Sequence, residues 1–491
     1  MLRRLLFLLL AASIAWTPAR AQLPALGGSG DLSLAAERKM GEQVARELYR
    51  DPDYIEDPVL DEYVLGIWTR LLGAARARGD LVEIDSRFAW RVLLGKDREI
   101  NAFALPGGWM GMNLGLISAT TSADEVAAVL GHELTHVTQR HISRMMTQQS
   151  KQMPLIIAAM ILGAIAAGRN VDAGQAAIVG GQALAAQNQI NFTRDMEREA
   201  DRIGLAVMTQ AGYDPHAFAT MFEKLGKASR LNDSGAFPYL RTHPMTTERI
   251  AEVEQRTQLA APVPPHGPDM VHLMMAGRSK VLSEPGVDTL RSYVAADAIR
   301  PDPAHRANEA GAVYAAALAE MKLQDTKAAL ALTKRLAELT ASNPEAARQT
   351  RLLAAQIALY AGDTAPAEAL AGAGGRPEVM LASQALIRSG HAAQVSDKLQ
   401  TWVSLNPKDS MAWQLLSQAW AAQGQQLRAV RAEAEARAAQ LDWQAALDRF
   451  RAAQELSRRP GLPQRDYIEA SIIDTRAREM SSLLREQALE R

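Results

Sequence analysis

Cysteine is absent from this sequence of 491 residues. The absence excludes disulfide bonds, thiolate metal sites, cysteine nucleophiles and lipid anchors attached to a cysteine. A chain without cysteine needs no oxidative folding if it is exported. The absence therefore removes several classes of enzyme and anchor before any motif is considered.

Aromatic residues and an excess of charge of either sign are also lacking. Aromatic residues make up 5% of the chain, and 54 Lys and Arg face 55 Asp and Glu, for a net charge of -1. A near-neutral chain argues against a general nucleic-acid binder, which would carry a strongly basic domain. With 48% hydrophobic and 22% charged residues, the composition indicates a globular protein of about two to four domains. Abundant Ala and Leu favour helices.

No apolar run reaches the roughly 20 residues that a membrane-spanning helix needs. The segment Met1–Ala21 has two arginines, the apolar run Leu5–Trp16 and a small-x-small pattern ending at Ala21. These features predict a signal peptide cleaved after Ala21, so that Gln22 begins the mature chain. The alternative is an uncleaved anchor. The expected compartment is the bacterial periplasm.

A second uncharged run, Pro154–Gly168, is also shorter than a span. It is interpreted either as a buried core helix or as a mobile apolar lid or interfacial segment. The longer stretch 154–190 is weakly patterned and could form a lid over a site. The sequence does not decide whether it touches lipid.

Three parts are predicted after the signal peptide. Residues 32–258 carry the motifs, residues 259–268 contain four prolines and form a linker, and residues 269–491 are helical throughout. The first part reads as mixed helix and strand. Its expected helices are Leu34–Tyr49, Val59–Leu72 and Ser122–His141, and its expected strands are Phe88–Leu94, Ala102–Leu105 and Met110–Leu114. Ser122 and Glu125 predict a capping box at the start of the third helix.

The last part shows pairs of helices joined by short turns. Gly390 and Gly424 lie 34 residues apart, which is the period of tetratricopeptide repeats, but Gly362 and Gly390 lie only 28 apart. The pattern therefore predicts a degenerate tetratricopeptide-repeat solenoid, with a concave surface for peptides or partner segments. A generic helical bundle is the alternative.

The chemical centre is the motif H-E-x-x-H at residues 132–136. On a helix, His132 and His136 lie four residues apart on one face, so that both imidazoles can reach one Zn²⁺. Glu133 then stands beside the open position, where it can take a proton from water and pass it to a leaving amine. The alternative is an ordinary charged helix.

The third ligand is expected downstream, from residues 197–201. Glu197 and Asp201 share a helix face, so Glu197 could complete a site of two histidines and one glutamate while Asp201 orients a ligand histidine. Glu199 points about 200° away from Glu197 and is the weaker choice. A third histidine six residues after His136 would indicate a metzincin, but position 142 is Ile. His141 is expected to be exposed or to support a ligand.

These motifs resemble the gluzincin family that includes HtpX and the CAAX prenyl proteases. The resemblance covers residues 32–258, and with a signal peptide before it and repeats behind it the chain looks like the BepA-type periplasmic metalloproteases. Beyond H-E-x-x-H and E-x-x-A-D, the segments that carry it are Asn101–Gly108, Gly212–Pro215, Thr242–Pro244 and Arg249–Ile250. The resemblance implies His132, His136 and Glu197 as zinc ligands, Glu133 as catalyst and Asp201 as support. This chain lacks the membrane spans of HtpX and the prenyl proteases.

Two further elements have open interpretations. Zincins bind substrate as an added strand, and Ala102, Phe103, Ala104 and Leu105 form the candidate edge, the alternative being a buried hairpin strand. His243 could stabilise the oxyanion, act as a fourth zinc ligand that keeps the enzyme latent, or be a hydrogen-bonded loop residue. His216, His266, His272, His305 and His391 have no partner spacing and are expected at the surface or in packing.

The sequence thus predicts a predominantly helical α+β protein, with a zincin-like domain and small sheet followed by an all-α repeat solenoid. The expected activity is that of an endopeptidase with one Zn²⁺ per chain. The resemblance implies action on misfolded or stalled outer-membrane proteins, assistance to their assembly, and recruitment of the β-barrel assembly machinery through the repeats. Peripheral membrane contact is left open. The competing hypotheses are a non-proteolytic periplasmic chaperone or adaptor and a repeat scaffold with a decayed protease.

Overall fold

The computed structural model describes residues 32–148, 186–230, 239, 243–258, 269–283, 286–296, 305–458 and 466–488. The predicted signal peptide, the run Pro154–Gly168 and the linker 259–268 lie outside the described residues. Of the stretch 154–190, the structure describes only 186–190, which begin a helix. Among the described residues, no helix is both long enough and apolar enough to cross a membrane.

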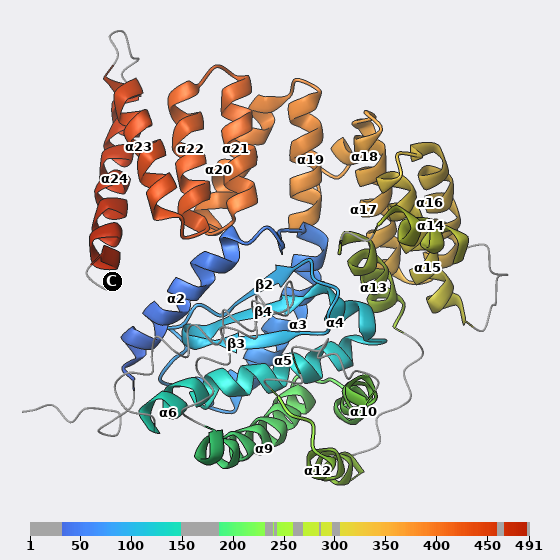
Figure 1. The fold of residues 1–491 in the computed structure, drawn as a ribbon. Coiled ribbons are helices and arrows are strands. Elements are labelled where there is room, and N and C mark those ends of the chain that lie inside the picture. The colour runs from blue at the N-terminus through green and yellow to red at the C-terminus, as the bar shows by residue number, and fades with distance from the viewer. Residues whose placement is uncertain are drawn as a thin grey trace, which may run out of the picture.

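The first half of the chain folds around a small sheet with helices on either side (Figure 1). In chain order its elements are α2 (Leu34–Arg50), β1 (Tyr54–Ile55), α3 (Pro58–Ala77), β2 (Arg91–Gly95), β3 (Ala102–Leu105), η1 (Pro106–Gly108), β4 (Trp109–Asn113), α4 (Leu114–Ala119), α5 (Ala123–Thr138), α6 (His141–Gln148), α9 (Ala186–Gln210), α10 (His216–Arg230) and α12 (Thr247–Gln258). In Figure 1, α5 lies between the sheet and the helices α9, α10 and α12. The predicted α+β fold class is confirmed.

The sheet has the strand order β1-β2-β4-β3, with β2 and β4 parallel and the two outer pairs antiparallel. Strand β3 is therefore an edge strand, paired on one side only, with Ala104 opposite Met110. Gly107 and Gly108 have φ of 73° and 80°, which allows the turn from β3 into β4. Strand β2 begins at Arg91 and not at the predicted Phe88, because Trp90 has a φ of 48° and interrupts the extended backbone.

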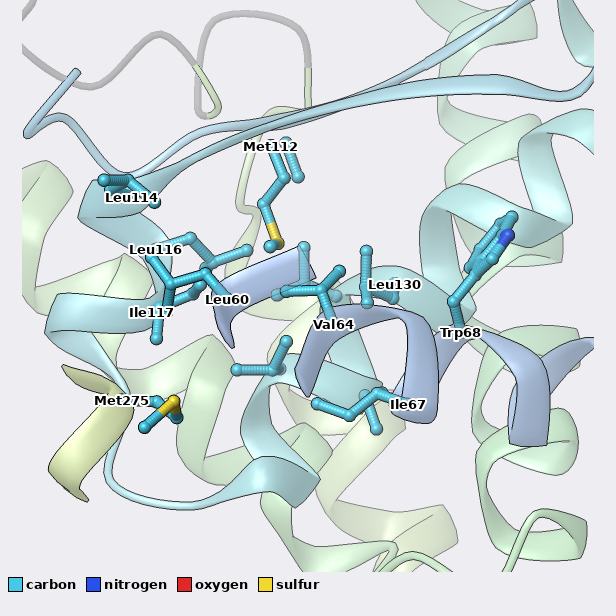
Figure 2. Close-up of a cluster of buried hydrophobic side chains, with 14 of the residues drawn as sticks. Leu60, Val64, Ile67, Trp68, Met112, Leu114, Leu116, Ile117, Leu130 and Met275 are labelled. Carbon is cyan, nitrogen blue, oxygen red and sulfur yellow. The ribbon is translucent and has the colours of Figure 1, made fainter. Parts of the chain in front are cut away.

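Helix α5 is buried along most of its length. Its N-cap, Ser122, accepts a hydrogen bond from the Glu125 N–H at 3.3 Å, but the Glu125 carboxylate accepts from the Thr121 N–H at 2.7 Å and not from the N-cap itself. The predicted capping box is thus shifted by one residue. Figure 2 shows Leu130 of α5 packed near Val64 and Ile67 of α3. Burial on all sides fixes the position of the helix that carries the motif.

The helix predicted over Ser122–His141 is not continuous. It ends at Thr138, and a new helix, α6, begins at His141. Arg140 adopts a φ of 53°, a left-handed conformation that a continuing helix cannot contain. Its guanidinium bonds the Glu37 carboxylate of α2 at 2.9 Å. Arg140 and Glu37 are 103 positions apart in the sequence. Their contact stabilises the break between α5 and α6, which no local sequence pattern indicated.

The second half of the described chain contains helices only. They are α13 (Met270–Leu282), α14 (Val287–Ala296), α15 (Arg306–Lys322), α16 (Thr326–Thr340), α17 (Pro344–Tyr360), α18 (Ala365–Glu368), α19 (Arg376–Arg388), α20 (Ala392–Leu405), α21 (Ser410–Ala422), α22 (Gln426–Ala439), α23 (Trp443–Ser457) and α24 (Asp466–Ala488). Figure 1 shows α19–α24 on the opposite side of the sheet from α5. Helix α18 is a single turn, which accounts for the short glycine spacing in this repeat. The assignment as tetratricopeptide repeats stays a prediction.

The two halves share one core. Met275 of α13 belongs to the same buried cluster as Leu60 of α3 and Ile117 of α4, as Figure 2 shows. Tyr314 of α15 and Ile357 of α17 extend that cluster. The proposed boundary at 259–268 therefore separates two segments of sequence whose hydrophobic side chains pack together, and the domain limits themselves stay a prediction.

Candidate metal centre

Two helices that cross closely supply the motif residues. His132 and His136 project from α5 and Glu197 from α9. At the crossing, a Cβ on Gly204 would lie 2.9 Å from the His132 backbone nitrogen. Such a distance is shorter than any side chain tolerates, so glycine at position 204 lets the two helices approach. The approach brings the Glu197 carboxylate to the two imidazoles.

Four potential donor side chains converge at this point. One ligand atom from each of His132, His136, Glu197 and His243 lies within 4.8 Å of every other. The Nε2 atoms of His132 and His136 are 3.0 Å apart, and both lie 3.4 Å from an oxygen of Glu197. The Nδ1 atom of His243 lies 3.0 Å from Glu197 Oε1 and 3.4 Å from His132 Nε2. The structure therefore brings together all three predicted ligands and His243.

The spacing of these atoms fits a zinc ion. Four donors placed tetrahedrally at about 2.0–2.1 Å from zinc are separated from one another by about 3.3 Å. Five of the separations, those among His132, His136 and Glu197 and those from His243 to Glu197 and His132, are 3.0–3.4 Å and lie close to that value, within a cluster whose ligand atoms are at most 4.8 Å apart. Imidazole nitrogens and a carboxylate oxygen are also the donor types that zinc prefers in a chain without cysteine. The ligand roles and the identity of the metal stay predictions.

Glu133 lies in the centre and is fully buried. Its Oε2 accepts a hydrogen bond from the Ala104 N–H of β3 at 2.9 Å, and its Oε1 lies 3.4 Å from His243 Nε2. Burial raises the pKa of Glu133, although His243 and His132 act in the opposite direction. The backbone of the edge strand thus fixes the orientation of the expected catalytic carboxylate.

Behind His132 stands a buried carboxylate held by an arginine. His132 Nδ1 lies 2.9 Å from Asp201 Oδ1, and the Arg249 guanidinium bonds both Asp201 oxygens at 2.7 Å. Arg249 also lies 2.9 Å from Glu197 Oε2. Asp201 therefore sits where an orienting residue is expected. Arg249 was part of the family resemblance only, and nothing in its spacing indicated that it reaches two carboxylates of the centre.

The electrostatics of the cluster favour a bound cation. Burial acts to lower the pKa of His132, but the hydrogen bonds that its ring donates to the Asp201 and Glu197 carboxylates outweigh this and raise the pKa to about 10. Burial lowers the pKa of His136 well below its usual value. For Glu197, burial acts to raise the pKa, yet His243 and His132 hold it well below its usual range. A divalent cation would take the place of the proton on His132 and balance the carboxylate charge.

The candidate substrate strand pairs with another strand on one side only. Ala102–Leu105 forms β3 at the edge of the sheet, as the edge interpretation expects. Because the Ala104 N–H donates to Glu133 and not to β4, residues 102 and 104 direct their backbone groups away from the sheet. Ala102 and Leu105 are fully buried and Phe103 and Ala104 are half-buried, and the role of this strand in substrate binding stays a prediction.

The other histidines that the structure describes are not among the four donors. His272 is buried and bonds the Tyr63 hydroxyl at 2.6 Å, while His216, His305 and His391 are exposed and His266 lies outside the described residues. His141 is 1% exposed and contacts His136 and Glu199, so that of its two expected positions the structure excludes the exposed one and agrees with the one beside a ligand. Tyr239, which sequence reasoning also missed, stacks on the His243 ring with centroids 4.7 Å apart.

Comparison with known proteins agrees with this geometry. Residues 77–257 match the model of Peptidase family M48. The chain is 35% identical over 243 residues to the beta-barrel assembly-enhancing protease of Escherichia coli K12, which is 49% of this chain and 48% of that protein. It is 33% identical over 194 residues to the mitochondrial metalloendopeptidase OMA1 of Arabidopsis thaliana, covering 40% of this chain and 36% of the relative. It is 29% identical over 225 residues to the metalloprotease LoiP of E. coli K12, covering 46% and 82%.

The matches support the resemblance seen in the motifs. The chain spans about half the length of the beta-barrel assembly-enhancing proteases that it matches. The matched residues 77–257 include both α5, which carries the H-E-x-x-H motif, and α9, which carries Glu197. The predicted relationship to these metalloproteases is therefore confirmed.

Proposed function

From the Peptidase family M48 domain at residues 77–257, we propose that this protein is a zinc-dependent endopeptidase. The observation that supports the proposal most directly is the convergence of His132, His136, Glu197 and His243 within 4.8 Å, beside the buried carboxylate of Glu133. A site that served stability alone would need no buried base next to its ligands.

The three motif residues His132, His136 and Glu197 would hold the zinc. When bound, zinc would polarise the scissile carbonyl and lower the pKa of water. The chain itself supplies the other parts of the reaction. Strand β3 holds the substrate backbone in an extended conformation, and Glu133, oriented by the Ala104 N–H, accepts a proton from the attacking water and donates it to the leaving amine.

For His243, the geometry supports the role of a fourth donor more than that of an oxyanion donor. Its Nδ1 faces Glu197 and His132 at 3.0 Å and 3.4 Å, which is the spacing of a fourth tetrahedral ligand. In that position it would exclude water and keep the enzyme latent until the residue is displaced. His243→Ala should then raise proteolysis. A loss of proteolysis would favour the oxyanion role, and an unchanged rate would contradict both.

We further propose that the protein acts in the periplasm on misfolded or stalled outer-membrane proteins. The support comes from the name of the relative in E. coli, a beta-barrel assembly-enhancing protease, and from the predicted signal peptide. The helices α13–α24 would recruit clients or the assembly machinery. Assistance to assembly without cleavage is the second candidate, because the helical half is large and separate from the catalytic residues in sequence.

The first test is zinc stoichiometry of the processed chain, measured beside Glu197→Ala. About one zinc per chain, weakened or lost in the variant, is expected. Absence of zinc after metal loading would contradict the hydrolase and leave the helical half as the functional part.

The second test is cleavage of an unfolded outer-membrane β-barrel protein by wild type and Glu133→Gln. A positioned general base contributes about 10²–10⁴-fold, so the variant should lose activity by that factor while retaining zinc. Glu223→Gln is the matched control, because Glu223 lies on α10 with its side chain half exposed and pairs only with Lys227 in the described structure. Equal cleavage by Glu133→Gln and wild type would contradict the assignment; activity of neither would favour the chaperone.

A further inference from the structure

Each histidine of the motif has a supporting residue behind it, and the two supports differ. His132 contacts the Asp201 carboxylate directly, at 2.9 Å. His136 contacts a second imidazole: its Nδ1 lies 3.0 Å from His141 Nδ1. The other nitrogen of His141, Nε2, lies 3.1 Å from Glu199 Oε2. The support behind His136 is therefore a chain of imidazole and carboxylate.

We propose that His141 and Glu199 are positioning residues that hold His136 in the single tautomer able to bind zinc. The proposal rests on the proposed function, because it assigns these residues a role toward the zinc of that site. Neither residue is itself one of the four donors. Both would act through His136, by fixing which of its nitrogens carries the hydrogen.

The hydrogen-bond pattern allows only one neutral arrangement that leaves a ligand lone pair on His136. Its Nε2 faces the other donors, at 3.0 Å from His132 Nε2, so the hydrogen of a neutral ring must be on Nδ1. That N–H donates to His141 Nδ1, which must then be an acceptor. His141 consequently carries its own hydrogen on Nε2 and donates it to Glu199. A carboxylate at the end of the chain selects the tautomer two rings away.

An arginine holds the Glu199 carboxylate in place. Arg144 of α6 donates to the same Glu199 oxygen at 2.8 Å. The pair forms where α6 meets α9, so the support behind His136 links two helices in the way that Asp201 and Arg249 link α9 and α12 behind His132. Both ligand histidines thus end on a carboxylate that an arginine holds.

The break between α5 and α6 gives His141 this position. On a continuous helix, residues five apart point about 140° away from each other, and His141 could not meet His136. The left-handed Arg140 redirects the chain, and α6 begins at His141 itself. The Arg140 guanidinium is anchored on Glu37, which is buried. A left-handed backbone conformation at a residue other than glycine costs free energy. Such strain is found where the resulting geometry serves a functional site, here by placing His141 next to His136.

The test compares zinc affinity in variants of the full mature chain, by competition with a chelator. His141→Leu removes the acceptor while keeping an apolar volume, and zinc affinity should fall by about 10–100-fold. His141→Gln restores an acceptor for the His136 N–H and a donor for Glu199, and should recover most of the affinity. His216→Leu, an exposed histidine of α10, is the control and should bind zinc as wild type does.

A second pair of measurements separates positioning from packing. The visible spectrum of the Co²⁺-loaded protein reports the geometry of the ligands; it should change in His141→Leu and return in His141→Gln. Glu199→Met, at a partly exposed position, tests the same chain if His141→Leu does not fold, and should weaken zinc binding by a smaller factor.

The outcomes are distinct from those of the proposed function. Zinc affinity unchanged in His141→Leu and Glu199→Met would overturn the inference while leaving the protease intact. A loss in His141→Leu that Gln does not recover would also overturn it, since packing would then be the cause. Failure of wild type to bind zinc would contradict the proposed function itself.

Discussion

The metal centre and the junction between α3 and the helical half are both built from buried charged groups, yet they are completed differently. At the junction, Asp57 receives two hydrogen bonds from Arg278, at 2.8 Å and 2.6 Å. Arg278 uses its remaining nitrogen on the Tyr314 hydroxyl and the Gln356 side chain. The donors and acceptors of this cluster satisfy each other.

At the metal centre, the acceptors face one another. The two Nε2 atoms of His132 and His136 lie 3.0 Å apart, and a carboxylate and a third imidazole point at the same space. Such an arrangement is unfavourable without a cation, because buried polar groups need partners. The comparison teaches that the chain satisfies the charged groups at the junction by itself, while the facing ligand atoms of the metal centre need a proton or a metal ion among them.

The largest change in the free energy of unfolding is expected from a substitution at the junction. Asp57→Asn keeps the N-cap of α3, since an amide oxygen can still accept the Leu60 N–H, but it leaves Arg278 buried without its charge partner. Removing one partner of a buried pair costs about 3–5 kcal/mol. Urea unfolding should show this loss with or without zinc. A loss below about 1 kcal/mol would show that the junction is not a buried ion pair in solution.

The second largest effect is expected from zinc binding at the metal centre. A ligand bound only by the native state stabilises it by about 2.7 kcal/mol at a free concentration 100 times its Kd. Zinc should therefore raise the Tm of wild type and of Asp57→Asn, and should have little effect on Glu197→Gln. If Glu197→Gln gained as much as wild type, the carboxylate would not be part of the zinc site.

The dependence on pH distinguishes the two clusters further. Burial acts to raise the pKa of Asp57, but the charge and hydrogen bonds of Arg278 outweigh it and lower the pKa below its usual value. The Arg278 guanidinium also donates a hydrogen bond to the Tyr314 hydroxyl. Because the folded pKa is the lower one, this stabilisation is present above about pH 4 and is lost as the pH falls through the folded value. The stability gap between wild type and Asp57→Asn should therefore narrow below about pH 4 in urea titrations repeated across that range. A gap that stayed constant would contradict the lowered pKa of Asp57.

The smallest effect is expected where the two halves meet at the surface. Arg50 and Asp442 pair at 3.3 Å with side chains 46% and 27% exposed. Exposed pairs of this kind contribute about 0–1 kcal/mol. Asp442→Asn should therefore change the free energy of unfolding by no more than that in urea titration. A larger loss would show that this contact is shielded from water in solution.

The sequence indicated the residues of the centre through local periodicity. The spacing i, i+4 placed His132 with His136 and Glu197 with Asp201, because a helix puts such residues on one face whatever it packs against. The strands 102–105 and 109–113 were also close to their predicted ranges, since the Gly107–Gly108 turn marks them. These features depend on a few neighbouring residues.

Other parts of the centre could not be predicted from spacing. Arg249 reaches Asp201 and Glu197 from 48 and 52 residues away, and His243 approaches from a segment that no pattern connects to the motif. Their positions follow from how α9 and α12 pack on α5. The expected continuous helix to His141 was wrong for the same reason: Glu37, distant in sequence, stabilises the conformation of Arg140.

The sequence by itself determined the donor types, the motif helix, the predominance of helices and the absence of thiol chemistry, because each depends on composition or on contacts within one helical turn. Only the tertiary structure decided that four donors meet, that an edge strand orients Glu133, and that His141 turns back toward His136. The physical reason is that hydrogen bonds and metal sites require distances of about 3 Å between atoms, and such distances between remote segments are set by the packing of whole helices.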